Sequence, residues 1–230
     1  QVQAAFLSSH EFVNLPRKLK VSIACCPDQC QQPELHCLSF VGTQRKQETS
    51  PENGFDLWVG GGLSNQWRFA QPLGIFLQPD QVLPTLEGIA RLYAQAGNLR
   101  VSRDQARLKH WVQALGLESF RKQLQEVLSF ELPSHESTEQ PADHYRDHVG
   151  VHAQKQEGLF AAGIPVPSGR MTTEQMLKVA DLAERYCSGG IRLTSRQNLM
   201  LLNLPFERVA QVLEGCEGVG LKIEASPIAR

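Results

Sequence analysis

The sequence has 230 residues, of which 41% are hydrophobic, which suits one or two folded domains and excludes a disordered chain. Its 23 lysines and arginines nearly balance its 24 aspartates and glutamates, so the net charge of −1 argues against a general nucleic-acid-binding protein. No apolar run approaches membrane-spanning length and no signal peptide opens the chain, so we expect no membrane partner.

Four of the six cysteines crowd between residues 25 and 37. Small secreted domains spread their cysteines into a disulfide framework, so this crowding favours reduced thiols and a cytoplasmic location. Cys26-x3-Cys30, with His36 nearby, also suggests zinc or an iron–sulfur cluster. Structural zinc sites usually place two close pairs at fixed spacings, and here the second pair is absent. Free thiols are the preferred interpretation, and we expect no metal ligands in this chain.

The first third of the chain predicts a small sheet. Alternating apolar residues predict strands over 20–25, near 38–41 and over 55–59, the last of which ends at three glycines. The polar, turn-rich residues 26–36 and 42–54 predict loops between these strands.

The middle of the chain predicts three helices. Asp80 is the expected N-cap of a helix over 81–96, and Ser102 with Gln105 predicts a capping box for a second helix that ends at Gly116. Apolar spacing predicts a third helix over 117–129. Residues 131–148 are poor in apolar groups and predict a linker, which divides the chain into domains over 1–130 and 149–230.

The last part predicts a compact α+β unit. A strand near 158–163 is followed by a helix that runs from a capping box of Thr172 and Gln175 to about residue 187. Strands over 191–194 and 199–202 flank a tight turn, and a short helix over 205–215 follows. This order fits most of a split ferredoxin-like unit, so the predicted fold class is α+β.

The basic stretch Asn14–Lys20 is the main candidate site. Pro16 stiffens the backbone, and Lys18 and Lys20 are two residues apart, so in an extended segment their ammonium groups point to one side while Arg17 points to the other. Two ammonium groups on one face form a good receptor for a small anion. The plain alternative is a solvated basic end of a strand.

Three other patterns have plain structural explanations. Gly60-Gly61-Gly62 matches neither glycine-rich nucleotide pattern, which leaves a turn that needs positive φ. The polar residues of 192–198 can be no more than a hairpin turn. His144, His148 and His152 would share one face of a helix and suggest a metal, but Gly150 weakens that helix.

Taken together and in order, five segments resemble the siroheme-dependent sulfite and nitrite reductases, the assimilatory ferredoxin-linked branch in particular. These segments are Asn14–Lys20, Gly54–Ser64, Gly150–Gln156, Pro165–Arg170 and Ile191–Leu199. The resemblance covers nearly the whole chain. It implies that residues 1–130 are part of the first siroheme-binding α/β domain and that residues 149–230 are a ferredoxin-like half-domain.

The resemblance also implies an activity and roles for the first group of residues. The activity is the six-electron reduction of sulfite to sulfide or of nitrite to ammonia, with ferredoxin as electron donor and with siroheme and a 4Fe-4S cluster as cofactors. Lys18 and Lys20 would contact the anion and help to deliver protons. Arg17 would lie near the carboxylates of siroheme. Gly60, Gly61 and Gly62 would let backbone approach the macrocycle.

A second group is expected to reach the cofactor from the other half of the molecule. By resemblance it contains Arg192, Thr194, Gln197 and Asn198. Arg196 would join Arg17 and Arg192 in neutralising the rim of siroheme, because guanidinium pairs with carboxylate in bidentate geometry.

Two departures bear on the match. Ala153 stands where the family commonly has proline, and the two cysteine pairs that hold the cluster are expected outside this chain. We therefore expect a central segment of a reductase that is inactive by itself. The alternative is a non-catalytic α+β module that binds anions without siroheme. Lys18-Leu19-Lys20 favours sulfite, since the family's nitrite enzymes typically have Lys-x-Asn there.

Overall fold

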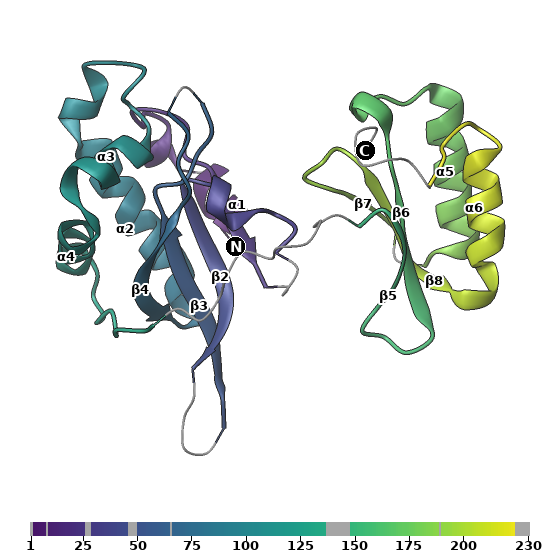
Figure 1. Cartoon of the computed structure of the whole chain (residues 1–230), viewed down its shortest axis with the longest axis horizontal. Coiled ribbons are helices and arrows are strands. Elements are labelled where there is room, and N and C mark those ends of the chain that lie inside the picture. The colour runs from purple at the N-terminus through teal and green to yellow at the C-terminus, as the bar shows by residue number, and fades with distance from the viewer. Residues whose placement is uncertain are drawn as a thin grey trace. The chain divides into compact units, whose positions relative to one another are not determined.

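The computed structural model describes residues 2–7, 9–25, 29–45, 50–64, 66–136, 148–188 and 190–223. The chain divides into two compact units, Gln1–His144 and Tyr145–Arg230 (Figure 1). Each unit combines helices with one four-stranded sheet and has its own apolar core, which confirms the predicted α+β class. Within the described part of the chain, no helix is both long enough and apolar enough to cross a membrane.

The sheet of the first unit has the order β1-β2-β3-β4, with β1 parallel to β2 and the other pairs antiparallel. The strands are β1 (Val21–Ala24), β2 (Leu38–Arg45), β3 (Glu52–Val59) and β4 (Gln71–Leu77). The predicted loop over 42–54 is wrong at both ends, because β2 and β3 extend into a long hairpin (Figure 1). Polar side chains pair across the two strands of this hairpin, such as Arg45 with Glu52 at 2.5 Å.

Strand β4 was not predicted at all. Leu73, Ile75 and Leu77 alternate, but the strand also contains Pro72 and Gly74, which are unusual in a strand, and Gly74 has a φ of +71°. The neighbouring strand β3 supplies the pairing partners that hold it in place.

Helices cover one face of this sheet (Figure 1). They are α2 (Val82–Gln95), α3 (Leu108–Leu115) and α4 (Leu117–Val127), and a short helix α1 (Val2–Leu7) precedes them. Phe40, Leu57 and Ile75 are fully buried in the core between the sheet and the helices. Trp111 of α3 meets Phe120 of α4 edge to face at 5.4 Å between ring centroids, which joins the two helices.

Two of the predicted helix starts are wrong. Asp80 does not cap α2, because a turn over Pro79–Gln81 comes first and its capping box is formed by Gln78 and Gln81. Ser102 and Gln105 form a turn instead of a capping box, and α3 begins only at Leu108. In both places a tight turn uses the polar residues before the apolar periodicity of the helix begins.

The first part of the predicted linker belongs to the first unit. Leu132 is buried in the core, Phe76 N–H donates to the Pro133 carbonyl at 3.2 Å, and His135 N–H donates to the Gly74 carbonyl at 3.0 Å. Backbone pairing with the free edge of β4 therefore outweighs the low apolar content of this stretch. Residues 137–147, the rest of the predicted linker apart from residue 148, lie outside the described part of the chain.

The second unit has an antiparallel sheet of order β5-β6-β8-β7 with two helices, α5 and α6, on one face (Figure 1). The elements are β5 (Gly150–Ala153), β6 (Leu159–Ile164), α5 (Thr173–Tyr186), β7 (Ile191–Leu193), β8 (Leu199–Pro205) and α6 (Val209–Glu217). Helix α6 continues past Gly215, where its end was predicted, because that glycine lies against Leu182 of α5.

The structure has strand β5 at Gly150–Ala153, where a helix would be needed for His144, His148 and His152 to share one face. Gly150 has a φ of +97° and His152 lies in the strand, so their sequence spacing does not translate into a helical stripe. His148 and His152 are nevertheless in ring contact at 5.8 Å, while His144 lies outside the described residues.

The predicted capping box of α5 is confirmed and gives a direct test of the fold. Thr172 Oγ1 accepts from Gln175 N–H at 3.2 Å, and Gln175 Oε1 accepts from Thr172 N–H at 2.9 Å. Thr172→Ala should lower the free energy of unfolding of the second unit by about 1 kcal/mol. Thr173→Ala, at the first helical position, is the matched control. Urea unfolding followed by NMR signals of α5 measures both, and equal losses would contradict the capping role.

Candidate anion-binding site

A cavity of about 870 Å³ opens in the first unit where four segments of the chain meet. The segments are the basic stretch before β1, the turn before β2, the loop after β3 and the start of α3. The charged side chains of lysine, arginine and aspartate that line it are Arg17, Lys18, Lys20, Arg103, Arg107 and Asp104. Since cations outnumber the carboxylate among these described residues, the cavity is suited to an anionic ligand.

The sequence prediction that Lys18 and Lys20 share a side is supported by their place in this cavity. Arg17, which the alternation predicted on the other side, lines the same cavity as the two lysines. Strict alternation requires a strand, and β1 begins only at Val21, after the basic stretch has ended. Leu15 and Leu19 pack against the core instead, which leaves the cations on the cavity side.

The glycines after β3 are required by packing inside the protein. A Cβ atom on Gly61 would lie 2.4 Å from the His36 carbonyl oxygen, and one on Gly62 would lie 2.6 Å from Arg107 Nη2. Gly60 has a φ of +85°. None of the three lines the 870 Å³ cavity, whereas Leu63 and Ser64, which follow directly, do. Approach of these glycines to a macrocycle stays a prediction.

Two buried cations of α3 and its N-cap hold the loop that carries Leu63 and Ser64. Lys109 is 1% exposed, and its Nζ donates to Ser64 Oγ at 3.2 Å, to the Gly62 carbonyl at 3.4 Å and to the Gln66 carbonyl. Arg107 is 8% exposed and donates to the Leu63 carbonyl at 2.8 Å. Both cations therefore donate to backbone carbonyls of this loop and order one wall of the cavity.

Sequence reasoning missed these two residues. Arg107 and Lys109 flank Leu108 at the start of an amphipathic helix, where charged side chains normally lie on the solvated face. The available signal was the position of Lys109, three residues before the buried Val112 and therefore on the same face of the helix.

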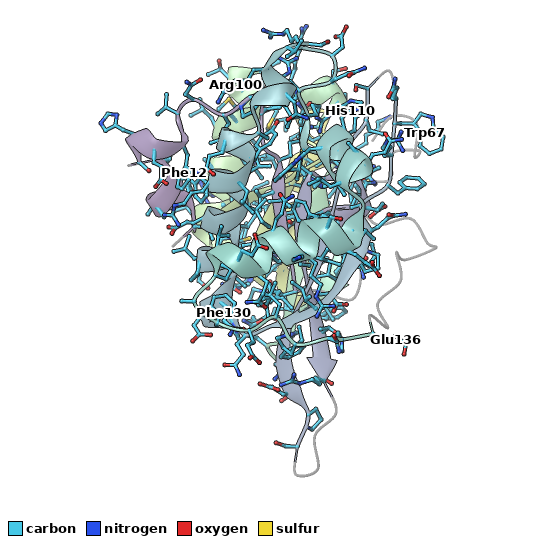
Figure 2. The ribbon with its side chains drawn as sticks, turned by 90° about the vertical axis from the view of Figure 1, so that its left-hand side faces the viewer. Phe12, Trp67, Arg100, His110, Phe130 and Glu136 are labelled. Carbon is cyan, nitrogen blue, oxygen red and sulfur yellow. The ribbon has the colours of Figure 1, made fainter. Side chains whose placement is uncertain are left out.

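His110 of α3 lines the same cavity and responds to its charges. Burial lowers the pKa of His110 below the ordinary 6.5, and the nearby Lys109, Arg68 and Arg107 lower it further. At neutral pH its imidazole is therefore uncharged and adds nothing to the positive charge of the cavity. Figure 2 places His110 at the same end of the first unit as Arg100.

The second group of candidate residues lies in the second unit, around the turn between β7 and β8. Thr194 Oγ1 accepts from Asn198 N–H at 3.1 Å, and Asn198 Oδ1 accepts from Val166 N–H at 2.9 Å. Asn198 is buried, and Gln197 adopts a φ of +63°. Thr194 and Asn198 thus shape the turn, while Arg192 and Gln197 are exposed and Arg196 is half-buried. Contact of these five residues with a cofactor stays a prediction.

Cys25, Cys37, Cys187 and Cys216 are free thiols. Cys37 is buried and accepts a hydrogen bond from Arg107 Nη2 at 3.3 Å, whereas Cys25 is exposed. Cys26 lies outside the described residues. In the part of the chain that the structure describes, no group of three or more His, Cys, Asp or Glu side chains converges as a metal site would require.

Comparison with known proteins covers both units. Residues 1–132 match the nitrite and sulphite reductase 4Fe-4S domain, and residues 152–219 match the nitrite/sulfite reductase ferredoxin-like half domain. Sulfite reductase [ferredoxin] 1 of Mycolicibacterium paratuberculosis is 37% identical over 94% of this chain and 38% of its own length. The chloroplastic ferredoxin–nitrite reductase of Zea mays is 34% identical over 87% of this chain and 35% of its own.

A solved structure is similar as well. The NirA protein of Mycobacterium tuberculosis superposes with a TM-score of 0.87 and 31% identity over 98% of this chain and 40% of that one. The chain thus spans 35–40% of the length of these three relatives. Because reductases match along nearly the whole chain, a non-catalytic module is not favoured.

The first prediction from this site concerns the buried ammonium group. Lys109→Met leaves the carbonyls of Gly62 and Gln66 without their buried donor, so the free energy of unfolding of the first unit should fall by about 2 kcal/mol. Lys122→Met, at an exposed position of α4, is the matched control. Urea unfolding followed by NMR signals of β2 measures both variants. A loss no larger than that of Lys122→Met would show that Lys109 does not order the loop.

The second prediction concerns pH. Since the folded state lowers the pKa of His110, the unfolded chain binds the proton more readily as pH falls below 6.5, and the contribution of this residue to stability is lost there. His110→Gln should therefore reduce the loss of unfolding free energy between pH 7.5 and pH 5.5, values taken about one unit either side of the ordinary pKa. His10→Gln, in an exposed turn, is the control. Identical pH dependence in wild type and His110→Gln would contradict the lowered pKa.

Proposed function

Because the chain belongs to the nitrite and sulphite reductase 4Fe-4S domain family, we propose that it forms part of an enzyme that reduces sulfite to sulfide or nitrite to ammonia. The observation that carries this proposal is the cavity in which Lys18 and Lys20 meet three arginines. A small oxyanion is the substrate class that such a cavity suits, since its charge is matched and its oxygens can accept from ammonium groups.

Lys18 and Lys20 bind the oxygens of the anion in this proposal. Their Nζ atoms carry the protons that the departing oxygens need, so the same two groups hold the substrate and supply protons as water leaves. The loop held by Lys109 closes the cavity beside them with Leu63 and Ser64. Neutral His110 lines the same cavity but carries no extra proton to donate at neutral pH.

Siroheme fits the donor set of the cavity. The group carries several carboxylates around a flat ring, and guanidinium groups pair with carboxylates in bidentate geometry. Arg17 and Arg103 of the first unit would hold these carboxylates, together with Arg192 and Arg196 of the second. When bound, siroheme would pass electrons from the electron donor to the anion. Gly60, Gly61, Gly62, Thr194, Gln197 and Asn198 are proposed to approach it as well.

The 4Fe-4S cluster does not fit the described residues, which contain no converging group of cysteines. We expect its thiolate ligands outside residues 1–230, so this chain alone would hold no cluster. Ferredoxin is proposed as the electron donor because relatives that match along most of the chain carry it in their names. Free cysteines support a reducing, cytoplasmic compartment.

We also propose that the chain consists of two domains with different roles, joined by a linker. Residues 1–130 form part of the siroheme-binding domain and carry the anion site, residues 131–148 connect the domains, and residues 149–230 form the ferredoxin-like half-domain. Two independent apolar cores support this division, although residues 131–136 already pack on the first unit.

The proposal is tested by an absorption spectrum of the full-length protein, expressed from the complete reading frame that encodes this chain. Siroheme bands that shift on addition of sulfite or nitrite are expected. A folded full-length protein without these bands, even after supply of the cofactor during expression, would overturn it.

The pair of lysines leads to a prediction about substrate preference. Sulfite is a dianion over much of the physiological pH range and nitrite is a monoanion, so a second fixed cation stabilises bound sulfite more. In the full-length enzyme, Lys20→Asn should lower kcat/KM for sulfite about tenfold more than kcat/KM for nitrite. Lys122→Asn serves as the control. Equal losses of kcat/KM for both anions would indicate that Lys20 acts as a general proton-delivery or structural group and does not set substrate preference.

A further inference from the structure

We propose that Arg100 is a positioning residue for the anion site and holds the segment that carries Lys18 and Lys20 in place. The inference deepens the proposed function and rests on it for the identity of the anion. Arg100 ends the turn Gly97–Arg100, which directly follows α2. Figure 2 shows it at the same end of the first unit as His110, and Arg100 itself lies outside the lining of the cavity.

The guanidinium of Arg100 joins two segments that are far apart in sequence. Nη1 donates to Asn14 Oδ1 at 3.2 Å, and Nη2 donates to the Asn14 carbonyl at 2.7 Å and to the Ala94 carbonyl at 3.2 Å. Ala94 lies in the last turn of α2, where carbonyls lack partners within the helix and a cation is favoured. One side chain thus fixes the start of the basic stretch to the end of a core helix.

The other end of the basic stretch is fixed independently. The Lys20 carbonyl accepts from Leu38 N–H of β2 at 3.1 Å, so Lys20 is tied to the sheet. Between the two ties lie Pro16, which restricts the backbone, and Leu15 and Leu19, which pack against the core. Lys18 is therefore held between Arg100 at one end and β2 at the other.

Arg100 also relates two walls of the cavity. The chain runs from Arg100 directly into residues 102–105, which line the same cavity as the basic stretch that begins at Asn14. If Arg100 no longer holds Asn14, the distance between the lysines and residues 102–105 is less firmly fixed. An anion that needs both lysines at once is sensitive to such a change, because binding groups must be held in place before the ligand arrives.

A long-range effect of the Arg100 charge is the alternative explanation, and variants separate the two. Arg100→Gln removes charge and contacts, Arg100→Lys keeps the charge but cannot form the same fork, and Asn14→Ala removes one acceptor without a change of charge. Arg185→Gln, which breaks an exposed ion pair with Asp181 in the second unit, is the control for loss of a positive charge.

Two measurements on the whole chain decide the question. NMR titration with sodium sulfite, at fixed pH and ionic strength, gives the dissociation constant from the amide signals of Lys18 and Lys20. Order parameters of the amides of Leu15, Arg17, Lys18 and Leu19, measured without sulfite, report whether the segment is held. Arg100→Gln should weaken sulfite binding about fivefold and lower these order parameters. Arg100→Lys should recover less than half of the lost sulfite affinity and order. Asn14→Ala should show losses between those of wild type and Arg100→Gln. Arg185→Gln should match wild type in both measurements.

Unchanged order parameters in Arg100→Gln, or full recovery of both readouts in Arg100→Lys, would overturn the positioning role. Failure of the proposed function looks different. If Lys18→Ala and Lys20→Ala bind sulfite as wild type does, or if wild type does not bind it, the anion assignment fails. The order parameters still decide whether Arg100 positions the segment in that case.

Discussion

The first unit depends on how it accommodates two buried cations. Arg107 and Lys109 lie at the start of α3 within a cluster of positive charge, and burial together with Arg107 and Arg68 lowers the pKa of Lys109. A buried cation is tolerated only when its protons meet acceptors. Here the acceptors include backbone carbonyls of the loop after β3. The loop conformation and the protonated state of Lys109 therefore support each other.

That arrangement leaves the cavity with an excess of positive charge. Hydrogen bonds to backbone carbonyls hold Arg107 and Lys109 but do not cancel their net charge. The basic stretch adds Arg17, Lys18 and Lys20 to the lining of the cavity. His110 adds no charge at neutral pH because its pKa is lowered. Under the proposed function, a bound anion offsets this excess, so anion binding also stabilises the wall of the cavity.

The two units contribute to the proposed chemistry in different ways. The first has a cavity with convergent charge, while the turn at 194–198 of the second is shaped by Thr194 and Asn198 and presents arginines beside it. Both units match domains of the nitrite and sulphite reductases.

Sequence patterns by themselves determined the α+β class, the capping box of Thr172 and Gln175, most helices and strands, and the basic stretch with Lys18 and Lys20. These features depend on local periodicity and on neighbours a few residues apart. Only the tertiary structure decided the pairing of β4, the attachment of residues 131–136 and the contacts of Arg100, Arg107 and Lys109. Each of these depends on backbone carbonyls or strand edges contributed by distant segments, and a backbone acceptor leaves no trace in the identity of the residue that provides it.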